Sequence, residues 1–196
     1  MDGLKLQKIQ NNIGESSQPT NTFSDFVYFF SSIIDKTTEF YWLIEGGYGL
    51  IFNLPESWFE DAWYDEKYDI EHSVKLDEFE SHFILDRRSE KSFILTEPDF
   101  LKKYAKYIVD DWWDIIGFYK PPHDIEDYFK KLSEIYNPLE KANFLDKTAD
   151  ICFFNIDAAY WEIFAQDHSI IKSIVKDTES KSGFNATTIK LINKTA

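Results

Sequence analysis

Side chains able to bind a cation crowd one short part of the chain. Within fourteen positions the sequence places Asp69, Glu71, His72, Asp77, Glu78, Glu80 and His82. These residue types suit Zn²⁺ or Ca²⁺, but the motifs HxxxH and HExxH and the EF-hand spacing with its central glycine are missing. The sequence therefore predicts no dedicated metal site and no cofactor.

Paired carboxylates offer a second kind of chemistry. A glycosidase needs two acids that flank a sugar, often with aromatic platforms beside them, and this chain has 35 Asp and Glu residues and 18% aromatics. With so many acids, any pair can be nominated, and 196 residues is short for a glycosidase barrel. A small hydrolase that uses paired carboxylates stays an alternative.

Motifs for other catalytic chemistry are missing from the sequence. There is no GxGxxG or GxxxxGK[ST] motif to cradle a phosphate, and no GxSxG motif around a serine nucleophile. The single cysteine, Cys152, lies in an apolar run and is expected to be a small buried hydrophobe. We therefore expect a protein that is not an enzyme.

The strongest compositional feature is the acidic segment, which we define as residues 56–80. It holds ten carboxylates and two lysines, and so carries more than half of the net charge of -14. Aromatic residues are interspersed among the acids, a composition typical of a surface that meets a basic protein partner. The residues predicted to bind that partner are Trp58, Glu60, Asp61, Trp63, Asp65, Glu66 and Asp69. In the alternative interpretation the acids only keep the protein soluble.

A second patch is predicted on a helix over residues 98–116. On that helix Trp112 faces the core, whereas Trp113 points about 100 degrees away from it. Trp113 then lies beside Asp110 and Asp114, where an exposed tryptophan flanked by acids is the kind of residue that anchors an interface. Asp110, Trp113 and Asp114 are therefore added to the predicted partner-binding residues.

The charge balance narrows the choice of partners. Phosphate contacts need Lys and Arg, and 21 of these face 35 acids, which argues against direct nucleic-acid binding. A DNA-mimic inhibitor of a nucleic-acid enzyme stays an alternative because it would use the same acids. Residues 1–22 lack the apolar core of a signal peptide, and no stretch reaches the roughly eighteen apolar residues of a membrane helix. We expect a cytoplasmic protein that does not bind a membrane.

The elements that must position these side chains follow from periodicity and from turn signals. Residues 1–22 are expected to be a mobile tail, and the acidic segment is expected to be mostly loop with one short helix around residues 58–63. Helices are predicted over 23–35, 98–116 and 124–136, and a short helix with its first core residue at Ile170 is predicted to end near Asp177. Strand pairs are predicted over 39–54, 81–96 and 149–165, with a weak last strand over 186–192.

Strands that arrive as hairpins with helical segments between the pairs favour an α+β fold over a parallel one. We expect a mainly antiparallel sheet built from hairpins, with about four helices packed on one face. The predicted domain covers residues 23–178, and residues 179–196 are expected to be a weakly ordered C-terminal segment.

Three features together resemble bacterial immunity proteins of polymorphic toxin systems. They are the opening helix, the strand Tyr-Trp-Leu-Ile at 41–44, and the run Asp-Ala-Ala-Tyr-Trp-Glu-Ile at 157–163 that precedes a short helix. The resemblance covers residues 23–178 in style and composition. It implies a non-enzymatic inhibitor that binds a cognate toxin domain, often a basic nuclease, and blocks its active site.

Overall fold

The computed structural model describes residues 1–8, 23–45, 54–59, 63–65, 70–87, 93–107, 114–156, 160–180 and 184–190. Within these residues an eight-stranded sheet has the order β10-β1-β9-β8-β7-β2-β6-β5, and its neighbouring strands are antiparallel. Its strands are β1 (Asp2–Lys8), β2 (Tyr41–Glu45), β5 (Phe83–Asp86), β6 (Phe93–Thr96), β7 (Asp114–Phe118), β8 (Ile151–Ile156), β9 (Tyr160–Ala165) and β10 (Phe184–Lys190). A separate two-stranded sheet pairs β3 (Trp63–Asp65) with β4 (Ile70–His72).

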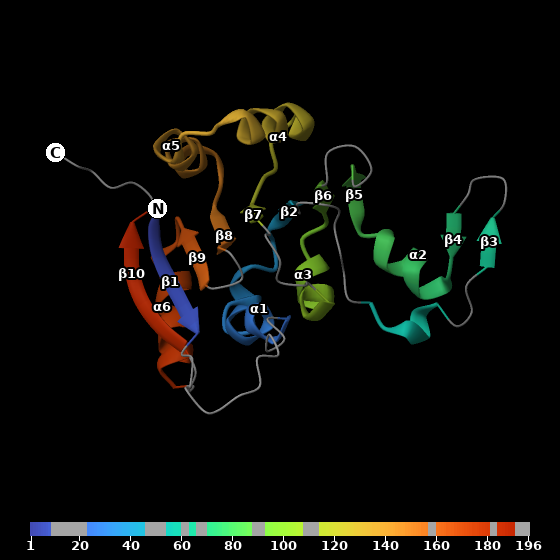
Figure 1. Cartoon of the computed structure of the whole chain (residues 1–196), viewed down its shortest axis with the longest axis horizontal. Coiled ribbons are helices and arrows are strands. Elements are labelled where there is room, and N and C mark those ends of the chain that lie inside the picture. The colour runs from blue at the N-terminus through green and yellow to red at the C-terminus, as the bar shows by residue number, and fades with distance from the viewer. Residues whose placement is uncertain are drawn as a thin grey trace, which may run out of the picture.

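Helices pack on both faces of the large sheet (Figure 1). One face meets α1 (Phe23–Phe30), α2 (Val74–Glu80), α3 (Phe100–Tyr104) and α6 (His168–Glu179), and the other meets α4 (Ile125–Glu134) and α5 (Pro138–Thr148). Short 3-10 turns are η1 (Ile34–Lys36), η2 (Glu56–Trp58) and η3 (Ala105–Tyr107). The predicted α+β class with an antiparallel sheet is confirmed, whereas the prediction that helices cover one face is wrong.

The central strands explain why both faces are covered. Strand β8 reads Ile-Cys-Phe-Phe-Asn-Ile, and its first five residues are buried. Because successive side chains of a strand point to opposite faces, such a run needs a packed layer on each side. Ile151 and Phe153 lie in the core under α1 and α6, while Cys152 and Phe154 lie in the core under α4 and α5. Cys152 is fully buried, as predicted.

The N-terminus is a strand over part of the predicted mobile tail. Asp2–Lys8 form β1 between β9 and β10, so the tail prediction is wrong for these residues, and residues 9–22 lie outside the described part of the chain. Leu4 and Leu6 are 1% exposed, and they alternate with polar Lys5 and Gln7. This alternation is the pattern of a strand with one buried face, and it was the signal for β1.

The helix predicted over 98–116 is much shorter in the structure. α3 and η3 cover residues 100–107, residues 108–113 lie outside the described part, and Asp114–Phe118 form β7. Spacing of apolar residues by three and four fits a helix, but Ile115 and Ile116 point to opposite faces of the sheet. The pairing of β7 with β2 and β8 makes residues 114–118 a strand and not part of a helix.

Gly117 lies within β7, closely packed against neighbouring strands. A Cβ atom at this position would lie 2.5 Å from a methyl carbon of Ile151 and 2.7 Å from the ring of Trp42. Neighbouring strands therefore leave no space for a side chain. Glycine is needed here for close packing across the sheet.

Two of the three predicted strand pairs are confirmed. β5 pairs with β6, and β8 pairs with β9, each as an antiparallel neighbour. The hairpin predicted over 39–54 is wrong, because β2 pairs with β6 on one edge and with β7 on the other. Residues 46–53, which include most of the predicted second strand, lie outside the described part of the chain.

The C-terminal half contains one helix that was not predicted. α4 ends at Glu134, near its predicted end, and α5 begins after Asn137, which caps its first turn, with Pro138 at the first position. Phe184–Lys190 form β10, which pairs with β1 and overlaps the last strand predicted over 186–192. The sheet therefore extends past both predicted domain limits. Among the described residues no helix combines the length and apolarity that a membrane crossing requires.

Candidate functional site

The acidic segment contains regular structure, which corrects the prediction that it is mostly loop. η2, the β3–β4 hairpin and α2 follow one another along it. In the hairpin Trp63 pairs with His72, and Asp65 pairs with Ile70. Figure 1 shows the hairpin beyond α2, away from the large sheet. These described elements of the acidic segment therefore lie outside the large sheet.

Trp58 joins this unit to the core. Its side chain is half-buried, and its ring centroid lies 5.1 Å from that of Tyr107 and 6.0 Å from that of Phe79. A third ring, Tyr104, lies 6.3 Å away, and all three contacts are edge-on, the arrangement that aromatic pairs favour. Trp58 thus holds η2 against α2 and α3, and only the exposed part of its side chain remains for a partner.

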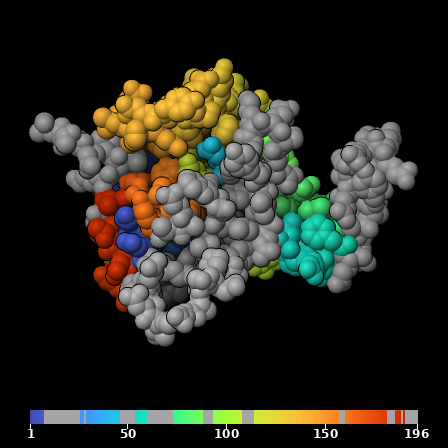
Figure 2. Space-filling view, viewed as in Figure 1, coloured from blue at the N-terminus to red at the C-terminus, as the bar shows by residue number. Residues whose placement is uncertain are grey.

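Exposed acids and exposed apolar side chains lie on η2 and α2, two elements that contact each other. Glu56, Asp77 and Glu78 are exposed, and Glu78 also pairs with Lys75 at 3.1 Å. Phe59 is 39% exposed and Val74 is 70% exposed. We name these five residues the η2–α2 surface: Glu56, Phe59, Val74, Asp77 and Glu78. Figure 2 shows residues 54–59 in teal beside the green of α2, at the opposite side of the molecule from β10.

None of these five residues is among the predicted partner-binding residues. Asp77 and Glu78 were considered as metal ligands, and Glu56, Phe59 and Val74 were not assigned to any site. A signal was present, because Ser73 is a helix-capping residue and its side chain accepts a hydrogen bond from the Leu76 amide. That cap starts α2 and turns Val74, Asp77 and Glu78 to solvent.

Most of the predicted partner-binding residues lie where the structure describes little or nothing. Trp63 and Asp65 are placed by the backbone of β3 alone. The residues outside the described part are Glu60, Asp61, Glu66, Asp69, Asp110 and Trp113. Their role in partner binding stays a prediction.

Asp114 does not lie on an exposed helix, so the second predicted patch is wrong for this residue. It begins β7, its side chain is 21% exposed, and one of its carboxylate oxygens accepts a hydrogen bond from Lys141 Nζ at 3.0 Å. Glu45 lies directly opposite Asp114 on β2. The cluster of Glu45, Asp114 and Lys141 is named the strand-end cluster.

The strand-end cluster shifts the proton affinities of its members. Burial and the neighbouring Asp114 charge raise the pKa of Glu45 from 4.5 to about 7, against the opposing effect of Lys141. Burial likewise raises the pKa of Asp114, although Lys141 opposes it. For Lys141 burial acts to lower the pKa, but the two carboxylates outweigh it and the pKa is raised. Near neutral pH the cluster therefore holds a charged lysine and a carboxyl group, Glu45, that is partly protonated.

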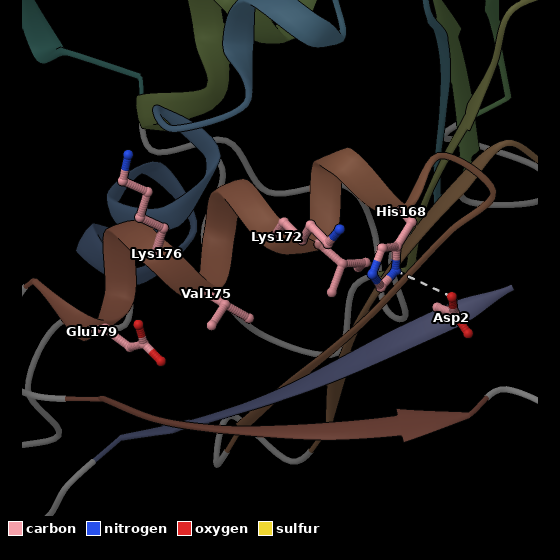
Figure 3. Close-up of a pocket in the computed structure, with 7 residues that line it drawn as sticks. Asp2, His168, Lys172, Val175, Lys176 and Glu179 are labelled. Atoms are coloured by element: carbon pink, nitrogen blue, oxygen red, sulfur yellow. Dashed lines mark ion pairs between the residues drawn. The ribbon is translucent and has the colours of Figure 1, made fainter.

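The structure also describes a groove of about 350 Å³ along α6, facing β1. Figure 3 shows Val175 pointing toward the strands and Lys176 pointing away from them, while His168 pairs with Asp2 at one end. His168 Nδ1 lies 3.1 Å from the Asp2 carboxylate, and both side chains are 53% exposed. Ile171 and Val175 supply the apolar part of its lining, and the charged side chains of Asp2, His168, Lys172, Lys176 and Glu179 supply the rest.

No known protein family, curated protein or solved structure matches the chain. The function is therefore argued from residue chemistry and geometry.

Proposed function

We propose that this chain is a non-enzymatic binding protein that neutralises a basic protein partner, as an immunity protein neutralises its cognate toxin domain. The observation that carries the proposal is the η2–α2 surface, where three acids and two apolar side chains are exposed on two elements that contact each other. Carboxylates steer a basic partner toward the surface and accelerate association. Phe59 and Val74 supply apolar contact that becomes buried in the complex.

The remaining acids of the acidic segment support the same role. Glu60, Asp61, Glu66 and Asp69 lie in the sequence between η2 and β4, outside the described part of the chain. A positively charged face of a partner would meet one continuous stretch of sequence with few competing lysines. Inhibition follows if that face contains the partner's active site.

The first experiment identifies the partner and tests its charge. The full chain is immobilised, exposed to the source cell's lysate at low salt, and washed at high salt, and the released proteins are identified by mass spectrometry. A single basic protein that salt releases is expected, because exposed charge pairs are screened. Recovery of several unrelated DNA-binding proteins would instead indicate a DNA mimic.

The second experiment locates the binding surface with the purified partner. D77N/E78Q removes two exposed acids from the η2–α2 surface and is expected to slow association several-fold and to weaken its salt dependence. E134Q/E140Q removes the same charge from α4 and α5 on the other face and is the matched control. A further variant, E60Q/D61N/D65N/E66Q, tests the predicted hairpin acids. Equal association rates for all four proteins would remove the acidic segment from the interface.

A small hydrolase is the second candidate, and the strand-end cluster favours it. Two carboxyl groups face each other across β2 and β7, and the raised pKa of Glu45 lets it act as an acid or a base near neutral pH. The groove that the structure describes lies elsewhere, along α6. The hydrolase predicts turnover of chromogenic glycosides that E45Q and D114N abolish without weakening any complex. Absence of turnover by the wild-type protein would dismiss it.

A further inference from the structure

A histidine and two acids from separate elements meet at one corner of the large sheet. His82 precedes β5, and Glu97 follows β6. The amide of Glu97 donates a hydrogen bond to the carbonyl oxygen of His82 at 2.9 Å, which fixes the two chain segments together. Asp99 lies two residues further along and immediately precedes α3. The three side chains therefore project from a corner that the backbone holds in place.

The ligand-type atoms of these residues lie close together. His82 Nδ1 is 3.3 Å from Glu97 Oε2 and 3.6 Å from Asp99 Oδ1, and one donor atom from each residue lies within 4.8 Å of the others. In the described part of the chain this is the one such group of histidine, cysteine or acid side chains. The nearby acids that the sequence analysis weighed as ligands, such as Asp77 and Glu78, are not part of it.

These separations are compatible with a bound cation. The 3.3 Å contact from Nδ1 to Glu97 Oε2 is within reach of a long hydrogen bond, whereas the 3.6 Å separation from Asp99 Oδ1 is too long for one. In a tetrahedral Zn²⁺ site with bonds of about 2.0–2.1 Å, neighbouring ligand atoms lie about 3.3–3.4 Å apart. One distance matches that spacing and the other needs only a small rotation of an exposed carboxylate. Three protein ligands with a fourth position open to water is a known arrangement for this ion.

The histidine is the fixed member of the group. Its side chain is only 12% exposed, and its ring centroid lies 5.4 Å from the ring of Tyr104. Glu97 is 51% exposed and Asp99 is 44% exposed, so both carboxylates can adjust to a ligand. A fixed imidazole with two adjustable carboxylates lets a cation set its own bond lengths.

Lys103 occupies the other side of the ring. Its Nζ atom lies 3.2 Å from His82 Nε2 and 2.8 Å from Asp99 Oδ2. An ammonium group only donates, so Nε2 accepts and the proton of the neutral ring is on Nδ1. A cation on Nδ1 moves that proton to Nε2, which then repels Lys103. Lys103 therefore competes with the cation. A variant without Lys103 should bind the cation more tightly, whereas variants without a ligand should bind it more weakly.

We propose that His82 Nδ1, Glu97 and Asp99 Oδ1 form a Zn²⁺ site at the corner between β5, β6 and α3. The bound ion links the start of β5 to the start of α3 and so stabilises the part of the fold next to α2. This site does not depend on the partner-binding proposal, since none of its three ligands belongs to the η2–α2 surface.

The test is titration of the metal-free full chain with Zn²⁺ alone, followed by calorimetry, with Co²⁺ as a spectroscopic substitute. One equivalent should bind, and Co²⁺ should give the intense visible absorption of a tetrahedral site. H82Q, E97Q and D99N should each weaken binding by at least about tenfold, the scale on which even supporting residues of metal sites act. K103M should bind several-fold more tightly, because it removes the competing charge.

Matched controls separate this site from general acidity. H168Q removes the histidine of the exposed Asp2 pair and should leave the affinity unchanged. E97Q and D99N alter exposed side chains, so they remain informative if H82Q does not fold. Zn²⁺ affinities that are equal in the wild type, E97Q, D99N and H168Q would overturn the proposal. So would a K103M variant that binds no Zn²⁺, because the group would then be only an ion-pair network.

Discussion

The strand-end cluster and the η2–α2 surface use the same carboxyl chemistry in opposite surroundings. Glu45 and Asp114 lie at the ends of paired strands next to the core beneath α5, where burial disfavours their charge. Asp77 and Glu78 lie on the solvent side of α2. An acid of the first kind affects the stability of the fold, while an acid of the second kind is exposed on the surface. Position relative to the sheet decides which role an acid has.

The largest expected effect comes from E45Q as a function of pH. The pKa of Glu45 is raised from 4.5 to about 7 in the folded state, so the stability that its proton contributes is present below pH 4.5 and lost as pH rises through 7. Glutamine resembles the protonated carboxyl group and does not titrate. E45Q should match the wild type near pH 4.5 and exceed it by on the order of 3 kcal/mol well above pH 7.

Urea denaturation across this pH range measures the difference, with E134Q as an exposed control that should follow the wild type. Parallel stability curves for E45Q and the wild type would contradict the assigned environment of Glu45.

The next effect comes from K141M above pH 7. Removing Lys141 leaves Asp114 and Glu45 close together without their cation, which is strongly destabilising for a buried pair. Lys141 is 34% exposed and Asp114 is 21% exposed, so water reduces the loss to about 2 kcal/mol of unfolding free energy. K131M is the comparison, because Lys131 also pairs with an acid but is 60% exposed. In thermal and urea unfolding, K141M should be clearly less stable than K131M. Equal stabilities of the two variants would show that the strand-end cluster does not stabilise the fold.

The smallest effect on stability is expected for D77N/E78Q. Both side chains are exposed, and substitutions at such positions change unfolding free energies by about 0.5 kcal/mol or less. The variant should therefore keep its stability while it loses association rate with a basic partner. A large loss of stability would instead give these acids a structural role and would weaken the contrast with the strand-end cluster.

Local patterns in the sequence were enough for the elements whose signals are short-range. The β5–β6 and β8–β9 pairs, α4 and α6 follow from turn residues, caps and periodicity, and all were predicted. In the same way Leu4 and Leu6 carried the alternation of β1. That signal was overlooked because the N-terminus was tested only as a targeting segment.

Long-range pairing decided the rest. Residues 114–117 have spacing that fits a helix, and only the neighbours β2 and β8 make them a strand. The meeting of Glu45 with Lys141, and of His82 with Glu97 and Asp99, likewise depends on contacts between elements distant in sequence. The spacing of residues along the chain does not show which side chains of distant elements come into contact.

The sequence by itself determined the acidic character of residues 56–80, the α+β class and the burial of Cys152, because composition and local period are properties of neighbouring residues. Only the tertiary structure decided that both faces of the sheet are covered, that Asp114 belongs beside Lys141, and which acids face solvent. The physical reason is that burial and pKa depend on what packs against a side chain, and the packing partners come from other parts of the chain.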